Sequence, residues 1–127
     1  MTAGERARAF VDEVLIPLEE RAERTGGRLP AEDVERIRRE ALARRVSGGR
    51  HAAEHGGQGW SAVEWFEVEE QFGRSTNALS WHVPTAYNVL AAGTPVQIDR
   101  YLRPALLGEL HDAYAVTEKR SVGCPWG

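Results

Sequence analysis

Three helix-start patterns constrain the fold of this chain more than any other feature of its sequence. In each one, a hydroxyl and a side chain three residues later satisfy backbone N–H groups that the first helical turn leaves unpaired. The three pairs are Thr2 with Glu5, Ser61 with Glu64, and Thr94 with Gln97. In the third, Pro95 also occupies the first helical position, where its fixed φ is favourable. These starts predict a chain that is helical over most of its length.

The residues after the first start repeat as one amphipathic helix. Apolar side chains recur at spacings of three and four, which places them on one helix face. They are Ala7, Phe10, Val11, Val14, Leu15, Leu18 and Ala22. Pro17 lies inside this run and cannot donate a bond to the Glu13 carbonyl, so a kink is expected there. A second helix is predicted from Pro30, with a thin apolar stripe that fades near Val46.

Two further helices are predicted in the second half of the chain before Thr94. The helix after Ser61 should end at Gly73, with Trp60 and Trp65 forming a hydrophobic staple across its start. Residues 78–93, ALSWHVPTAYNVLAAG, are apolar nearly all round and follow Asn77, a possible N-cap. A helix of that composition is expected to be buried on most faces, with an interruption at Pro84.

Two patterns occur in or overlap the glycine-rich stretch 47–59. Each one can be interpreted either as a binding site or as ordinary loop structure. His51, Glu54 and His55 fit H-x-x-E-H, a zinc-binding arrangement that needs a stable helix. Flanking glycines and the lack of an obvious third ligand favour a solvated loop. Residues 57–62 fit G-x-G-x-x-A, a nucleotide-binding pattern that requires a preceding strand. Because no strand precedes it, a tight turn leading into the next helix is favoured.

Other reactive side chains do not combine into a catalytic group. His82 is interpreted as a helix-face histidine, with a ligand contact as the alternative. Cys124 lacks a neighbouring histidine and is expected to be an inert thiol. We therefore predict no catalytic residue and no metal site in these residues.

Composition excludes several classes of partner. The chain has 127 residues, a net charge of −3 and basic residues that alternate with acidic ones, which argues against nucleic-acid binding. The charged N-terminus lacks a signal-peptide core, and no apolar run is long enough to span a membrane. A cytoplasmic protein with no membrane partner is expected.

Three stretches in order resemble the acyl-CoA dehydrogenase family. They are AAEHGGQGWSAVEWFEVEEQFGR at 52–74, AAGTPVQIDRYLRPALLGE at 91–109 and AYAVTE at 113–118. The resemblance implies an all-α fold over residues 1–110, an orthogonal bundle of about five to six helices that forms the family's N-terminal domain. Residues 111–127 would then begin the middle β domain with a short strand.

The resemblance also implies a flavin cofactor, FAD, and an acyl-CoA substrate. In that family an α-proton is removed by a base while the β-hydrogen leaves as hydride to the flavin. The residues expected to meet the flavin are Tyr114, Ala115, Val116, Thr117 and Glu118. Those expected to line the acyl pocket are Ser80, Trp81, Pro84 and Tyr87.

The family's catalytic base and most of its flavin site lie in segments beyond these 127 residues. After Glu118 the chain also departs from the family's Pro-x-Ala-Gly-Ser-Asp, continuing Lys-Arg-Ser-Val-Gly. The chain alone is therefore expected to be inactive. The alternatives are a helical interaction module, a subunit of a split enzyme that docks on a partner carrying the flavin site, and a gene remnant. A homo-oligomer is a further alternative.

Overall fold

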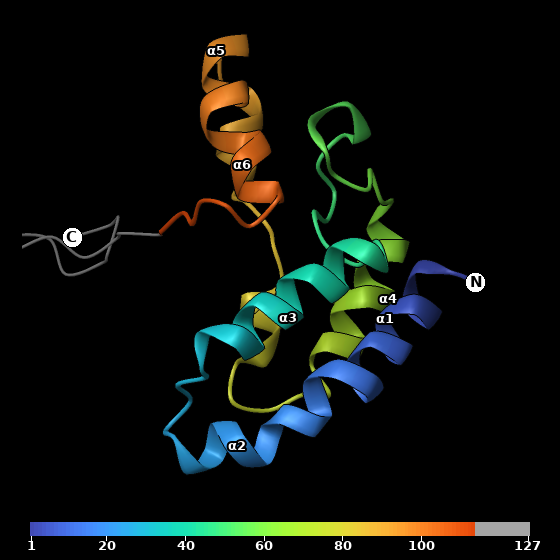
Figure 1. The fold of residues 1–127 in the computed structure, drawn as a ribbon. Coiled ribbons are helices and arrows are strands. Elements are labelled where there is room, and N and C mark those ends of the chain that lie inside the picture. Colours follow the sequence, from blue (N-terminus) through green and yellow to red (C-terminus); the bar gives the residue numbers. More distant parts are fainter. Residues whose placement is uncertain (114–127) are drawn as a thin grey trace, which may run out of the picture.

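The structure is a computed structural model that describes residues 1–113, and this part of the chain is helical and contains no strand (Figure 1). The α-helices are α1 (Ala3–Phe10), α2 (Glu19–Arg24), α3 (Ala31–Ala43), α4 (Ala62–Phe72), α5 (Pro95–Gln97) and α6 (Arg103–Leu106). Two π-helical turns (Val11–Leu15, Ile98–Leu102) and four 3-10 turns (Ile16–Leu18, Ala53–His55, Leu79–His82, Asn88–Ala92) complete the regular structure. The predicted helical class is confirmed. The strand predicted after residue 113 lies outside the described residues.

The first helical run continues past Pro17, where a kink was predicted. From α1 to α2 the chain stays helical, but its hydrogen-bond pattern changes around the proline (Figure 1). The Ile16 N–H bonds the Val11 carbonyl five residues back, and the Glu19 N–H bonds the Ile16 carbonyl three residues back. These π and 3-10 turns accommodate the missing proline N–H without ending the helix.

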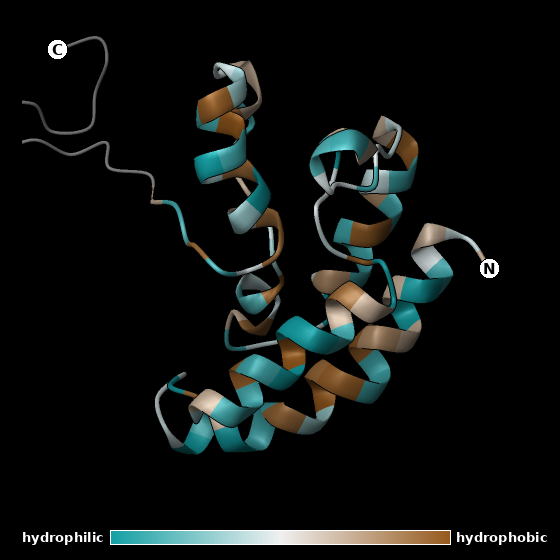
Figure 2. Ribbon diagram, turned by 45° about the horizontal axis from the view of Figure 1, so that its top comes forward, coloured by the Kyte–Doolittle hydropathy of each residue, from teal (hydrophilic) through white to brown (hydrophobic). Residues whose placement is uncertain are grey.

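The main core forms where α1 packs against α4. The rings of Phe10 and Phe72 meet edge to face, with centroids 6.2 Å apart. Gly4 permits close approach of the two helices, since a Cβ there would lie 3.0 Å from the Cβ of Glu67. Apolar segments of the helices turn toward this interface (Figure 2). The remaining buried members include Ala7, Val11, Val14, Leu15, Leu18, Ile37, Ala41, Val46, Val68 and Leu79.

Ion pairs attach α3 to the first helical run. Arg44 bonds Glu13 at 2.7 Å, and Arg21 bonds the largely buried Asp33 at 2.5 Å.

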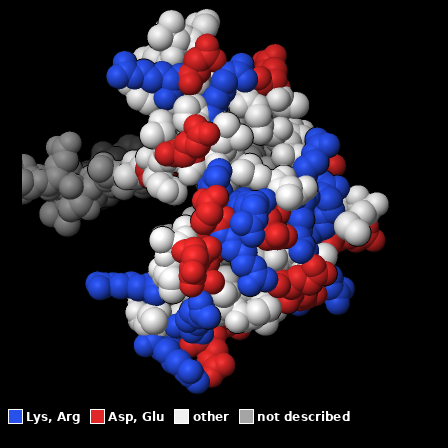
Figure 3. Space-filling view, viewed as in Figure 1, with Lys and Arg blue, Asp and Glu red and all other residues white. Residues whose placement is uncertain are grey.

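On the face shown in Figure 3, basic and acidic side chains are interspersed rather than gathered into patches of one sign. None of the helices in residues 1–113 has the length and apolar content that crossing a bilayer requires.

The helix predicted over residues 78–93 does not form. Asn77 and Ala78 have left-handed backbone conformations, with φ of 55° and 53°, so Asn77 is not a helix N-cap. Val83 is extended, which agrees with the preference of a residue before proline for extended over helical geometry. The segment is therefore two 3-10 turns joined by an extended stretch. The expectation of burial on most faces is also wrong, because Trp81 is 85% exposed.

The predicted helix starts agree with the structure at the capping boxes. All three predicted capping boxes are confirmed, including the one from Thr94 to Gln97 that starts α5. α4 ends before Gly73 as predicted, although the φ of −63° at this glycine is helical rather than left-handed.

The C-terminal helices form a second, smaller core. The second core consists of Ala86, Leu102, Ala105 and Leu106, with Leu90 and Ile98 at its edge. The helices α5 and α6 that carry this core stand above α3 in the view of Figure 1, apart from α1 and α4.

Candidate functional site

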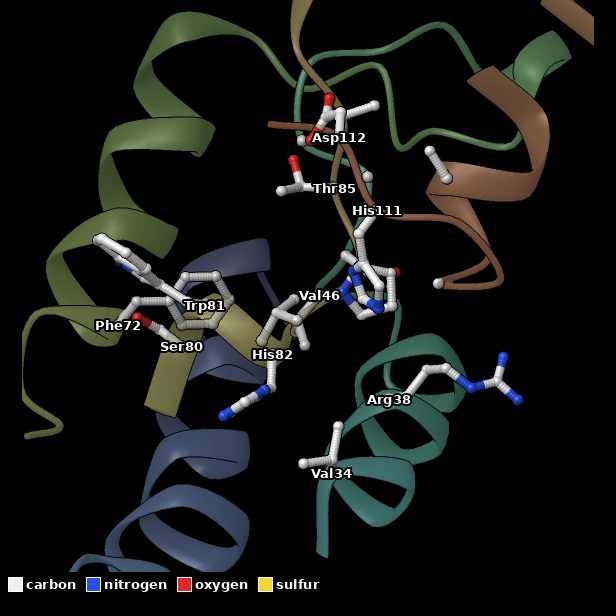
Figure 4. A pocket seen from close by; sticks show the side chains of 18 of the residues that line it. Val34, Arg38, Val46, Phe72, Ser80, Trp81, His82, Thr85, His111 and Asp112 are labelled. Carbon is white, nitrogen blue, oxygen red and sulfur yellow. The ribbon is translucent and has the colours of Figure 1, made fainter. Parts of the chain in front are cut away.

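A cavity of about 780 Å³ lies between the two cores. Its walls come from α3, the start of the glycine-rich loop, α4, the segment 80–87 and the chain after α6 (Figure 4). It is an open groove rather than an enclosed void. A volume of this size is within the range of small-molecule binding sites.

The four residues predicted to line an acyl pocket all line this cavity. Ser80 and Trp81 lie on a 3-10 turn, Pro84 is buried in the extended stretch, and Tyr87 is 48% exposed beyond it. The structure brings them together although the helix expected to carry them is absent. Ser80 and Trp81 lie near α4 (Figure 4), and Pro84 and Tyr87 line the cavity further along the segment.

Two tryptophans that sequence analysis assigned to packing also reach this cavity. Trp60 is buried as expected, but Trp65 is 36% exposed and is not a core residue. The Arg50 guanidinium lies 6.0 Å from the Trp65 ring centroid, and Trp65 Nε1 donates to Glu69 at 3.1 Å. The sequence offered one indication that Trp60 and Trp65 line the cavity. Both follow closely on the glycine-rich stretch 47–59, part of which also lines the cavity.

The glycine-rich loop holds the cavity wall in place. His51 Nε2 donates to the Ala86 carbonyl at 2.7 Å, which requires the proton on that nitrogen. The Gly48 N–H donates to the Pro84 carbonyl at 3.0 Å. His51 is buried, so the expectation of a solvated loop is wrong at this residue. No group of three or more potential metal-ligating side chains occurs within residues 1–113.

The G-x-G-x-x-A pattern forms a tight turn, as predicted. The Gly59 N–H bonds the His51 carbonyl at 2.8 Å, and Gly57 packs directly against the same peptide group. A Cβ at Gly57 would lie 2.0 Å from the His51 carbonyl oxygen, so the close approach requires glycine. The glycines therefore allow the loop to fold on itself before α4 begins.

Charged groups around the cavity already have protein partners. Arg38 bonds Glu35 through two nitrogens and donates to the Leu107 carbonyl at 2.7 Å. Asp112 accepts a 2.7 Å bond from the Tyr87 N–H, which ties the chain after α6 to the wall segment. The surface that a ligand would meet is therefore mainly apolar, with hydroxyl and imidazole groups among the rings.

His82 lies in the cavity wall and should make stability depend on pH. Partial burial lowers the pKa of His82 below its ordinary value of 6.5, and the charge of His111 lowers it further. The unfolded chain then binds a proton on His82 at a higher pH than the folded chain does. The free energy of unfolding should decrease as the pH falls below about 6.5.

Urea unfolding at pH values from 7.5 down to 5 measures this effect. The carboxylates with a lowered pKa, such as Glu35, contribute only near and below 4.5, so they do not interfere. His82→Gln should flatten the decrease across this range. An unchanged slope in the variant would assign the effect to other groups.

The residues predicted to meet the flavin, Tyr114, Ala115, Val116, Thr117 and Glu118, lie outside the described residues. Residues 1–113 contribute the walls of the cavity and the packed cores beside it.

Comparison with known proteins agrees with the helical fold and with the resemblance seen in the sequence. The family model described as "Acyl-CoA dehydrogenase, N-terminal domain" matches residues 2–109. Searches of curated proteins and of solved structures found no match. The family match covers most of the chain, including every helix of the structure. The chain therefore belongs to the acyl-CoA dehydrogenase family, of which it represents the N-terminal domain.

Proposed function

We propose that this chain is the N-terminal domain of an acyl-CoA dehydrogenase-like flavoprotein and that its cavity forms one wall of the acyl pocket. The observation that carries this proposal is the convergence of Ser80, Trp81, Pro84 and Tyr87 on one cavity. These residues were selected from the family resemblance alone. Their meeting in space supports a shared role in holding the acyl tail.

The chain's own part in the reaction is binding and exclusion of water. Apolar walls such as Phe72 and Val46 remove the acyl tail from water, which favours binding by about 25 cal/mol per Å² of apolar surface covered. FAD, when bound, supplies the hydride acceptor of the family reaction. The resemblance assigns the catalytic base to a later domain, so these residues orient the substrate and leave proton abstraction to other segments.

Calorimetric titration of the purified chain with an acyl-CoA tests the binding role. Thr85 lies exposed on the cavity wall, so Thr85→Trp should fill the space without disturbing the core. We expect this variant to weaken acyl-CoA binding at least about tenfold, since each lost 1.4 kcal/mol is a factor of ten. The matched control is Val63→Trp, which adds the same side chain at an exposed position of α4 outside the cavity. Equal affinity in all three proteins would contradict the proposal.

The purified chain should not reduce flavin on its own. Mixing it with FAD and an acyl-CoA under anaerobic conditions should leave the flavin absorbance unchanged. Bleaching of the flavin band at a rate above the protein-free control would show that the chain carries a base and a flavin site itself.

An interaction module is the second candidate function. Val63 and Phe66 on α4 are 67% and 70% exposed, which favours contact with another protein surface. In a split enzyme, such a surface would dock on a chain that carries the flavin and base domains. Co-expression with those family domains separates the candidates: a stable complex that reduces flavin favours the split enzyme, and a separate chain that binds no acyl-CoA favours the module.

A further inference from the structure

We infer that the acyl group accepted by this cavity carries a flat, uncharged ring system instead of being only a linear chain. This inference rests on the proposed function and adds a substrate class to it. Three properties of the cavity carry it: its size, its aromatic lining and the pairing of its charged groups.

The cavity is larger than a single ring requires. A void of about 150 Å³ is enough to bind benzene. The cavity here measures about 780 Å³, and its open side adds no steric limit. Two or more fused rings with a short acyl linker would fit in this volume.

Aromatic side chains enter the cavity from three separate parts of the chain. Trp60 and Phe72 form buried surface beneath it, while Trp65, Trp81 and Tyr87 are partly or largely exposed around it. In Figure 4, Phe72 and Trp81 lie on one side of the cavity, and Arg38 lies on the other. Offset or edge-to-face ring pairs contribute about 0.5–1.5 kcal/mol beyond the burial of their area. A ring system in the ligand gains this term from each ring that it meets, and a linear chain does not.

The exposure of Trp81 points in the same direction. Its side chain is 85% exposed although it borders a cavity lined by other rings. A flat ligand stacked on Trp81 would cover that apolar surface without any change in the core.

Charge pairing argues for an uncharged ligand group. Arg38 is held by Glu35, Glu69 accepts from Trp65 Nε1, and Asp112 accepts from the Tyr87 N–H. A charged ligand group would have to compete with these bonds. The hydroxyls of Ser80 and Thr85 remain suitable for one polar substituent on a ring.

Calorimetry with two acyl-CoA probes tests the inference on the 127-residue chain. Naphthylpropanoyl-CoA carries fused rings, and tridecanoyl-CoA is a linear acyl-CoA with the same number of acyl carbons. We expect the naphthyl probe to bind about tenfold more tightly, which corresponds to one or two ring pairs. Trp81→Leu should remove about tenfold from the naphthyl affinity and change the linear affinity by less than about threefold. Phe66→Leu, an exposed aromatic position of α4 outside the cavity, should change neither.

The outcomes separate this inference from the proposed function. Equal or tighter binding of tridecanoyl-CoA would overturn the ring preference and leave the acyl-binding role standing. A naphthyl preference that survives Trp81→Leu unchanged would also overturn the inference, because the aromatic wall would not be its cause. Binding of neither probe would overturn both.

Discussion

Replacing Phe10 with alanine is expected to lower the free energy of unfolding by about 3–5 kcal/mol. Phe10 is fully buried at the interface of α1 and α4, where its ring meets Phe72 edge to face. The substitution removes buried apolar area and the aromatic contact, and it leaves a void that the two packed helices can close only in part. Because domains are stable by only about 5–15 kcal/mol, the loss would leave the variant marginally folded.

Phe66→Ala is the matched control for this prediction. The same atoms are removed from a side chain that is 70% exposed on α4, so the expected change is within about 0.5 kcal/mol. Urea unfolding followed by circular dichroism measures both variants against the parent chain. Similar losses for Phe10 and Phe66 would mean that α1 and α4 do not pack as described.

Replacing Gly57 with alanine is expected to destabilise the chain by at least about 3 kcal/mol. The new Cβ would lie 2.0 Å from the His51 carbonyl oxygen, and the obstacle is backbone that cannot rotate away. The loop would have to open, which would disturb the bond from His51 to Ala86. We therefore expect weaker acyl-CoA binding as well as lower stability, because that bond holds the cavity wall.

Gly49→Ala separates this clash from the general effect of losing a loop glycine. Gly49 has a φ of 50°, and a Cβ added to it would meet no atom within 4 Å. The expected loss is therefore only the left-handed strain of about 1–2 kcal/mol. Thermal unfolding of both variants, with titration of an acyl-CoA, measures the two effects. A Gly57→Ala protein as stable as Gly49→Ala would show that the turn is not closed in solution.

Local signals in the sequence predicted the three capping-box helix starts correctly. Each capping box joins side chains and backbone only three residues apart, so its geometry needs no information from the rest of the chain. The same holds for Pro17, whose missing N–H changes the hydrogen bonding of its own helix. The first core was predictable for a related reason, since the apolar residues from Ala7 to Ala22 repeat with the helical period.

The segment 78–93 shows where local reasoning failed. Its apolar composition predicts a buried helix, but left-handed residues stand at its start and Pro84 divides it. Its path depends on distant partners, the Gly48 N–H and the His51 side chain, which bond the Pro84 and Ala86 carbonyls. Composition reports how apolar a segment is and not which contacts are available to it.

The sequence likewise predicted only part of the lining of the candidate site. Family resemblance selected Ser80, Trp81, Pro84 and Tyr87, while Trp60, Trp65 and Phe72 were not expected at the cavity. The four predicted residues are neighbours in the sequence, whereas the other three reach the space from α4 and the residue before its N-cap. When a cavity wall is built from several separate elements, the spacing of residues within one element does not reveal which residues of the others line it.

Sequence alone therefore established the helical class, the positions of the capped helix starts and the family, because each depends on short-range pattern or on ordered motifs. Tertiary structure alone decided the course of residues 78–93, the exposure of Trp65 and Trp81, and the existence of the cavity between the two cores. The physical reason is the distance along the chain over which each interaction acts. Capping and helical periodicity act within a few residues, whereas burial and cavity shape arise from contacts between segments far apart in the chain.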